Sequence, residues 1–167
     1  PSGSGVYNYR IYAEFLKYRF LWWCGFSLRK IRSLKVARIR VRGRSNQNCL
    51  VLLVANFFKD TRSAVFALRA FAPQIIEGYP SMLIELCRYI QENNLHGILR
   101  PHFIVASGEM LNRRERTYIE EILGGEVYDR YGLEEMGVIG VECRFHDGFH
   151  PYSESFILEI VDENGES

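Results

Sequence analysis

The most constraining feature of this chain is residues 103–137, where strand and helix signals alternate around two glycine turns. An apolar run leads into Ser107–Gly108, and a helix signal follows with Asn112 as N-cap and Glu115 three residues later. Gly124–Gly125 ends this helix, and Glu126–Val127–Tyr128 begins the next strand. Such an order predicts an α/β fold with a mixed, largely parallel sheet flanked by helices.

Both glycine turns, 107–111 and 128–137, are expected at the carboxyl ends of neighbouring parallel strands, where open α/β sheets bind ligands. In the second turn, the Tyr131 ring can stack on a base, and Gly132 lets backbone approach a ligand closely. A carboxylate such as Glu135 can hold Mg²⁺ against phosphates. The pattern therefore predicts a nucleotide site at this edge.

The remaining elements follow from periodicity and from caps. Helices are expected over 7–24, from Asp60 or Thr61 to about residue 71, and from Pro80 to about residue 93. Strands are expected over 34–41, 49–55, 75–76, 138–141 and 156–162.

Composition indicates one domain and no membrane span. The chain has 167 residues, of which 47% are hydrophobic, so residues 1–167 can bury one core and are treated as a single partial domain. It has no run of 18 apolar residues and no leader-like start. The four cysteines are scattered, which suits a reduced, cytoplasmic protein.

A net charge of +1 conceals two oppositely charged halves. Through Ala72 there are 14 Lys and Arg against 2 acids, and from Pro73 onward there are 7 Arg against 18 acids. One interpretation of the densest basic stretch, 29–44, is that it binds a nucleic acid. A solvated strand face, with the two halves attracting each other, is the favoured one, because the stretch lacks interleaved aromatic residues.

Three segments resemble the adenylate-forming acyl- and aryl-CoA ligases: 78–83 (Gly-Tyr-Pro-Ser-Met-Leu), 107–111 (Ser-Gly-Glu-Met-Leu) and 127–135 (Val-Tyr-Asp-Arg-Tyr-Gly-Leu-Glu-Glu). The most similar branch is phenylacetate–CoA ligase with the related capsular polysaccharide biosynthesis proteins. Glu142–Cys143, His150 and the ending 157–162 are also similar to that branch. The resemblance covers about residues 64–165.

The resemblance implies that ATP and Mg²⁺ bind here, with CoA as co-substrate and a small carboxylic acid as substrate. In the family, the Tyr ring lies against adenine and the last Glu of this motif lies on Mg²⁺. The implied nucleotide-site residues are Ser107, Gly108, Glu109, Asp129, Arg130, Tyr131, Gly132 and Glu134, with Glu135 as the catalytic Mg²⁺ ligand. Tyr79 and Pro80 correspond to part of the acyl pocket, and Ser2–Gly3–Ser4 to a remnant, within 1–5, of the phosphate loop.

The family places a catalytic lysine in a carboxyl-terminal domain, which would lie beyond residue 167. The resemblance therefore implies part of a large amino-terminal domain that is inactive alone, with that further domain as its partner. Two alternatives stay open: a non-catalytic homologue in polysaccharide biosynthesis, and a basic, zinc-containing nucleic-acid-binding module.

The zinc alternative rests on the loop 142–150. Cys143, His146 and His150 supply sulfur and imidazole ligands at a spacing that suits Zn²⁺. Zn²⁺ prefers four ligands, so a fourth would have to come from elsewhere.

Glu134 is the clearest departure from the family pattern, which has Ser or Thr there to contact phosphate. A carboxylate repels phosphate unless a metal or an arginine intervenes. We therefore expect Glu134→Thr to tighten Mg·ATP binding and Glu135→Gln to weaken it, as measured by titration calorimetry. Unchanged or lower affinity in Glu134→Thr would make Glu134 a solvent-facing acid or a metal ligand instead.

Overall fold

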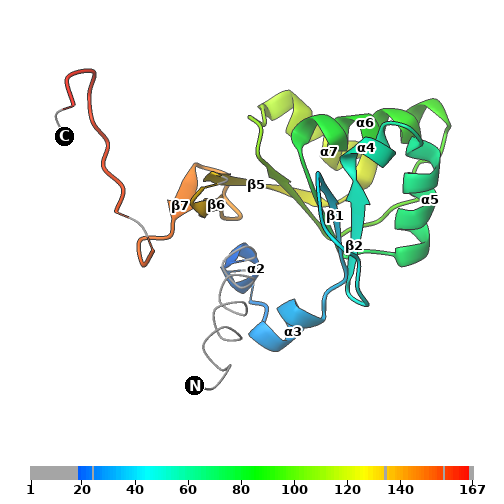
Figure 1. Cartoon of the computed structure of the whole chain (residues 1–167), viewed down its shortest axis with the longest axis horizontal. Helices are drawn as coiled ribbons and strands as arrows, with labels where there is room; N and C mark the ends of the chain where they lie inside the picture. Colours follow the sequence, from blue (N-terminus) through cyan, green and yellow to red (C-terminus); the bar gives the residue numbers. More distant parts are fainter. Residues whose placement is uncertain (1–18, 24, 134, 156, 166–167) are drawn as a thin grey trace.

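The computed structural model of this chain describes residues 19–23, 25–133, 135–155 and 157–165. Within these residues seven strands form one sheet, in the order β2-β1-β3-β4-β5-β6-β7 (Figure 1). They are β1 (Val36–Arg40), β2 (Cys49–Leu53), β3 (Ile75–Gly78), β4 (Phe103–Ser107), β5 (Glu126–Leu133), β6 (Gly137–Glu142) and β7 (Phe149–Pro151). Pairing is parallel from β2 through β5 and antiparallel from β5 through β7, which confirms the predicted mixed α/β sheet.

Helices cover the two faces of the sheet unequally. They are α2 (Arg19–Trp23), α3 (Leu28–Ser33), α4 (Val54–Phe57), α5 (Thr61–Phe71), α6 (Pro80–Glu92) and α7 (Arg113–Leu123). Figure 1 shows α4 to α7 gathered together, with α2 and α3 apart from them. None of the helices in the described residues is long and apolar enough to cross a bilayer.

Two apolar clusters lie on opposite faces of the sheet, because successive side chains of a strand point to opposite faces. Ile76 of β3 packs in the cluster that contains residues of α5, α6 and α7. Its neighbour Ile75 packs in the other cluster, together with Phe20 of α2 and Tyr128 of β5. The Phe20 and Tyr128 rings are stacked, with centroids 4.2 Å apart.

The predicted helix ends are confirmed. Asp60 caps α5 by accepting a 2.9 Å hydrogen bond from the Ser63 amide. Asn112 and Glu115 form the reciprocal capping box of α7, with bonds of 3.0 and 3.1 Å. Gly124 ends α7 in the left-handed conformation, at φ 75°.

Several predicted boundaries are wrong. β2 ends at Leu53 because α4 begins at the next residue. Residues 157–162, predicted as a strand, have no strand pairing in the described structure. The part of the predicted helix 7–24 that the structure describes, Arg19–Trp23, is helical as predicted, and residues 1–18 and 24 lie outside the described part.

A charged residue, Glu77, is buried inside β3, where its side chain is 3% exposed. Its carboxylate accepts a 2.7 Å bond from Arg130 Nη2 and a 3.3 Å bond from Arg38 Nε, and it also pairs with Arg40. Burial alone would raise the pKa of Glu77, but the guanidiniums of Arg130, Arg40 and Arg38 hold that pKa well below its ordinary value. These three ion pairs therefore link β1, β3 and β5.

We expect Glu77→Gln to lower the free energy of unfolding by about 3 kcal/mol at pH 7, because three buried or half-buried guanidiniums lose their shared charge partner. Since the pKa of Glu77 is lowered, its contribution is present above the unfolded-state pKa and is lost as pH falls. Urea unfolding at pH 7 and in acid measures both effects. The control is Glu85→Gln, whose partner Arg88 is exposed, and equal effects of the two variants would contradict this role for Glu77.

Candidate functional site

The carboxyl ends of β3, β4 and β5 bring the predicted site segments together. Gly78 pairs with Ala106, and Ser107 pairs with Arg130. The loop after β3, the loop after β4 and the second half of β5 therefore lie side by side.

Glu109 ties the loop after β4 to the start of α6. Its carboxylate oxygens accept 2.9 Å hydrogen bonds from the Ser81 amide and the Ser81 hydroxyl. Ser81 is in the first turn of α6, where unpaired amides and the helix dipole favour a negative charge. The predicted nucleotide ligand Glu109 is thus a helix cap in this structure.

Tyr79 and Gly108 are in close contact at the same edge. A Cβ at position 108 would lie 2.8 Å from Tyr79 Cε1, and Gly108 has φ +87°. Only glycine satisfies both constraints at low cost. Pro80 is the first residue of α6, as predicted, and is buried.

The segment 128–137 is a strand for most of its length, so the prediction of a turn directly after a short strand is wrong. β5 runs on to Leu133 because it pairs with β4 up to Arg130 and with β6 from Arg130 to Leu133. A Cβ at Gly132 would lie 2.5 Å from the Gly137 carbonyl oxygen. The close backbone approach that Gly132 allows is therefore to β6 of the same chain.

Tyr131 and Glu135 are both exposed in the hairpin that β5 and β6 form. Tyr131 is 50% exposed, and its ring lies 5.9 Å from the ring of Phe149 in β7. Glu135 is also exposed. Ser2, Gly3, Ser4 and Glu134 lie outside the described residues.

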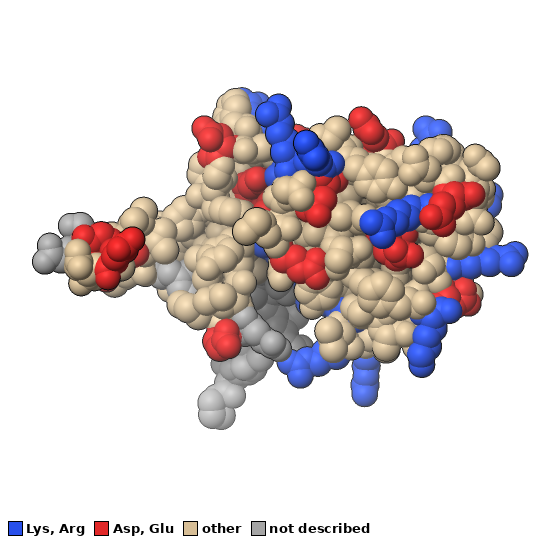
Figure 2. Space-filling model, turned by 90° about the horizontal axis from the view of Figure 1, so that it is seen from above, with Lys and Arg blue, Asp and Glu red and all other residues tan. Residues whose placement is uncertain are grey.

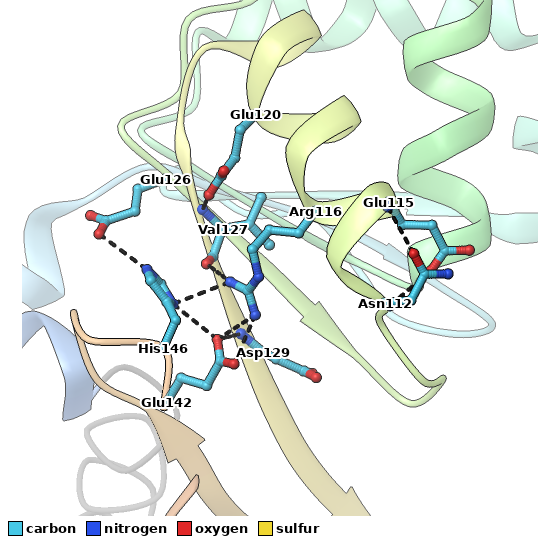
Figure 3. Close-up of polar contacts among 9 residues, drawn as sticks. All are labelled: Asn112, Glu115, Arg116, Glu120, Glu126, Val127, Asp129, Glu142 and His146. Atoms are coloured by element: carbon cyan, nitrogen blue, oxygen red, sulfur yellow. Dashed lines mark hydrogen bonds and ion pairs between the residues drawn. The ribbon is translucent and has the colours of Figure 1, made fainter. Parts of the chain in front are cut away.

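Asp129 and Arg130 do not have the same environment. The Arg130 guanidinium is buried against Glu77, on the sheet face whose apolar cluster contains Phe20. It therefore does not line the exposed surface around Tyr131. Asp129 is half-buried, and burial together with the neighbouring Glu142 carboxylate raises the pKa of Asp129 to about 6. Figure 3 shows that the Asp129 carboxylate points away from the carboxylate of Glu142.

Arg116 of α7 holds the helix against β5 and β6 (Figure 3). It donates to both Glu142 oxygens, at 2.7 and 2.8 Å, and also to the Val127 carbonyl. Glu142 in turn accepts a 2.8 Å bond from the Asp129 amide. This network fixes the backbone immediately before Tyr131.

His146 belongs to this network. Its Nδ1 lies 3.2 Å from Glu142 Oε2, and its Nε2 lies 3.3 Å from Glu126 Oε1. Among the described residues no group of three or more His, Cys, Asp or Glu side chains is arranged to hold a metal ion. The structure therefore does not bring Cys143, His146 and His150 together as the zinc ligands that their spacing predicted.

Sequence reasoning missed Glu77, Arg116 and Phe149. A lone acid in an apolar strand was a usable signal for Glu77. Arg116 and Phe149 gave no local signal, since their partners lie 26 and 18 residues away in Glu142 and Tyr131.

Basic side chains do not form a continuous surface on the face in Figure 2, where they are dispersed among acidic and uncharged ones. A cavity of about 310 Å³ lies at the opposite ends of β3 and β4, near Gln74 and His102. It includes none of the predicted site residues. We therefore take the carboxyl ends of β3, β4 and β5, which carry the predicted site segments, as the candidate site.

The fold is similar to solved structures of larger proteins. For IdnL1 the TM-score is 0.61 at 15% identity, over 92% of this chain and 34% of that one. For 2-hydroxyisobutyryl-CoA ligase with 2-HIB-AMP, the TM-score is 0.59 at 16% identity, over 83% and 32%. For the anthranilate CoA ligase AuaEII with anthranoyl-AMP, it is 0.57 at 15% identity, over 81% and 29%.

At this identity the likeness establishes the fold alone. The chain spans about a third of the length of these structures. No protein-family model matches the sequence, and no curated protein matches it.

We expect Asp129→Asn to stabilise the protein at pH 7.5 by about 1 kcal/mol, after allowing for solvent screening of a half-exposed group. The folded-state pKa of about 6 exceeds the ordinary value of 3.8, so the wild-type protein loses stability as pH rises through 6. The gain should vanish below pH 4. Chemical unfolding against pH measures it, with exposed Asp147→Asn as the control, and a gain that is independent of pH would contradict the assignment.

Proposed function

We propose that this chain is part of the large amino-terminal domain of an adenylate-forming acyl- or aryl-CoA ligase and contributes its base-binding edge. One observation carries the proposal: the β4–β5 pairing of Ser107 with Arg130 sets the Ser-Gly-Glu turn beside Tyr131. These are the two motifs on which the sequence resemblance rests. The similar folds of two ligases with bound acyl-adenylates support it.

In the proposed reaction, a carboxylate oxygen attacks the α-phosphorus of ATP, forming an acyl-adenylate and releasing pyrophosphate. The thiol of CoA then attacks the acyl carbon, forms the thioester and releases AMP. This chain would contribute positioning more than bond chemistry. Tyr131 offers an exposed ring for the base, and the backbone of Gly108 lies at the same edge.

Mg²⁺ suits the oxygen ligands at this edge. Glu135 would hold the ion, since its carboxylate is exposed and lies four residues after Tyr131. The bound ion would neutralise phosphate charge. Asp129 is a poorer ligand, because its raised pKa reflects a site that already disfavours a negative charge.

Tyr79 and Pro80 would form part of the acyl pocket. The half-buried Tyr79 ring packs on Gly108, so the position of this ring depends on the loop that Glu109 clasps to α6. A bound carboxylic acid would therefore contact a ring whose position this loop sets. The sequence resemblance favours the phenylacetate–CoA ligase branch, and therefore an aryl-substituted carboxylic acid as substrate.

A non-catalytic homologue is the second candidate, and one sequence observation favours it: Glu134 replaces the hydroxyl residue of the family motif. Such a protein could bind nucleotide without releasing pyrophosphate. Pyrophosphate release, measured with the chain joined to a lysine-bearing carboxyl-terminal domain, separates the two candidates. The 167-residue chain alone is expected to release none.

We expect the chain to bind Mg·ATP saturably and Tyr131→Ala to weaken binding about tenfold, because stacking of one base on an aromatic ring contributes about 1–3 kcal/mol. Glu135→Gln should weaken binding with Mg²⁺ present but not with EDTA. Titration calorimetry measures both, with Glu121→Gln on the exposed side of α7 as the control. Absence of saturable binding at millimolar ATP would contradict the proposed function.

A further inference from the structure

Two half-exposed aromatic rings meet beside the proposed nucleotide site. Tyr131 of β5 is 50% exposed and Phe149 of β7 is 45% exposed. Their ring centroids are 5.9 Å apart, with the planes inclined by 46°. Rings that served only the core would be buried, so this pair presents aromatic surface to solvent.

Gly140 of β6 lies between the strands that carry the two rings. It pairs with Tyr131 on one side and with Pro151 on the other. A Cβ at position 140 would lie 3.4 Å from Phe149 Cβ and 3.0 Å from the His150 carbonyl oxygen. Glycine at this position therefore lets β7, which carries Phe149, lie close against β6.

Two other apolar side chains of the same hairpin are exposed as well. Leu133 and Met136 are 44% and 51% exposed. Exposed aromatic rings such as Tyr131 and Phe149 favour a planar ligand that can stack on them.

We propose that Phe149 is a positioning residue for the base of the bound nucleotide, acting with Tyr131 as one aromatic platform. The proposal rests on the proposed function. Rings 5.9 Å apart leave no room for a base between them, because a base would need about twice the stacking distance of about 3.5 Å. The base therefore stacks on the outer face of Tyr131, and Phe149 supports the Tyr131 ring from the other side.

The test compares ligands with and without a base. The chain and its Phe149→Leu variant are titrated with Mg·ATP, with AMP and with Mg·tripolyphosphate. Phe149→Leu should weaken ATP and AMP binding threefold to tenfold and leave tripolyphosphate binding unchanged, because only the base contacts the platform. Phe149→Tyr should restore the affinity.

The matched control is Phe145→Leu. Phe145 is 72% exposed and lies four residues before Phe149, where its ring packs on Arg144. This variant should bind all three ligands like the wild-type chain. Thermal unfolding of both variants checks that the fold is kept.

Each outcome decides between the two proposals. If the wild-type chain binds ATP and Phe149→Leu binds it equally well, Phe149 has no positioning role and the proposed function stands. An equal loss for ATP and tripolyphosphate would also overturn the role, since it would show a general defect. If the wild-type chain binds none of the nucleotides, both the function and this inference fail.

Discussion

The buried carboxylate of Glu77 is the interaction on which the arrangement of this sheet depends. It lies one residue before the end of β3 and pairs with guanidiniums from β1 and β5. Removing water from a carboxylate is costly, and only the surrounding arginines offset that cost. In addition to the backbone pairing of the strands, this one carboxylate and its partners link β1, β3 and β5 across the sheet.

This anchoring also determines which way the neighbouring residue faces. Successive side chains on a strand point to opposite faces, so an Arg130 held against Glu77 on one face directs Tyr131 to the other. The Arg116–Glu142 pair acts on the opposite face, where Glu142 accepts the Asp129 amide. Two ion pairs, one on each face of the sheet, thus hold residues 129 and 130 directly before the proposed base-binding ring.

What could be predicted from sequence was local. The caps Asp60 and Asn112 and the alternation of strands and helices depend on residues within a few positions of each other, and all are confirmed. The continuation of β5 through Gly132 depends on pairing with β6, and a sequence pattern does not contain that pairing. The Cys/His spacing predicted zinc ligands, whereas His146 contacts two carboxylates, that of Glu142 four residues before it and that of Glu126 twenty residues before it. The continuation of β5 and the contact with Glu126 therefore depend on segments that are distant in sequence.

The separation of charge along the chain has the same explanation. The first 72 residues carry an excess of 12 positive charges and the remainder an excess of 11 negative charges. Arg38 and Arg40 from the basic part pair with Glu77 of the acidic part, and Arg19 pairs with Glu154. At least part of the basic excess is therefore neutralised inside the fold, and burial of Glu77 shields its pairs from salt. A nucleic-acid partner is therefore not needed to account for these arginines, and the proposed ligand site rests on the exposed ring of Tyr131 rather than on the basic stretch.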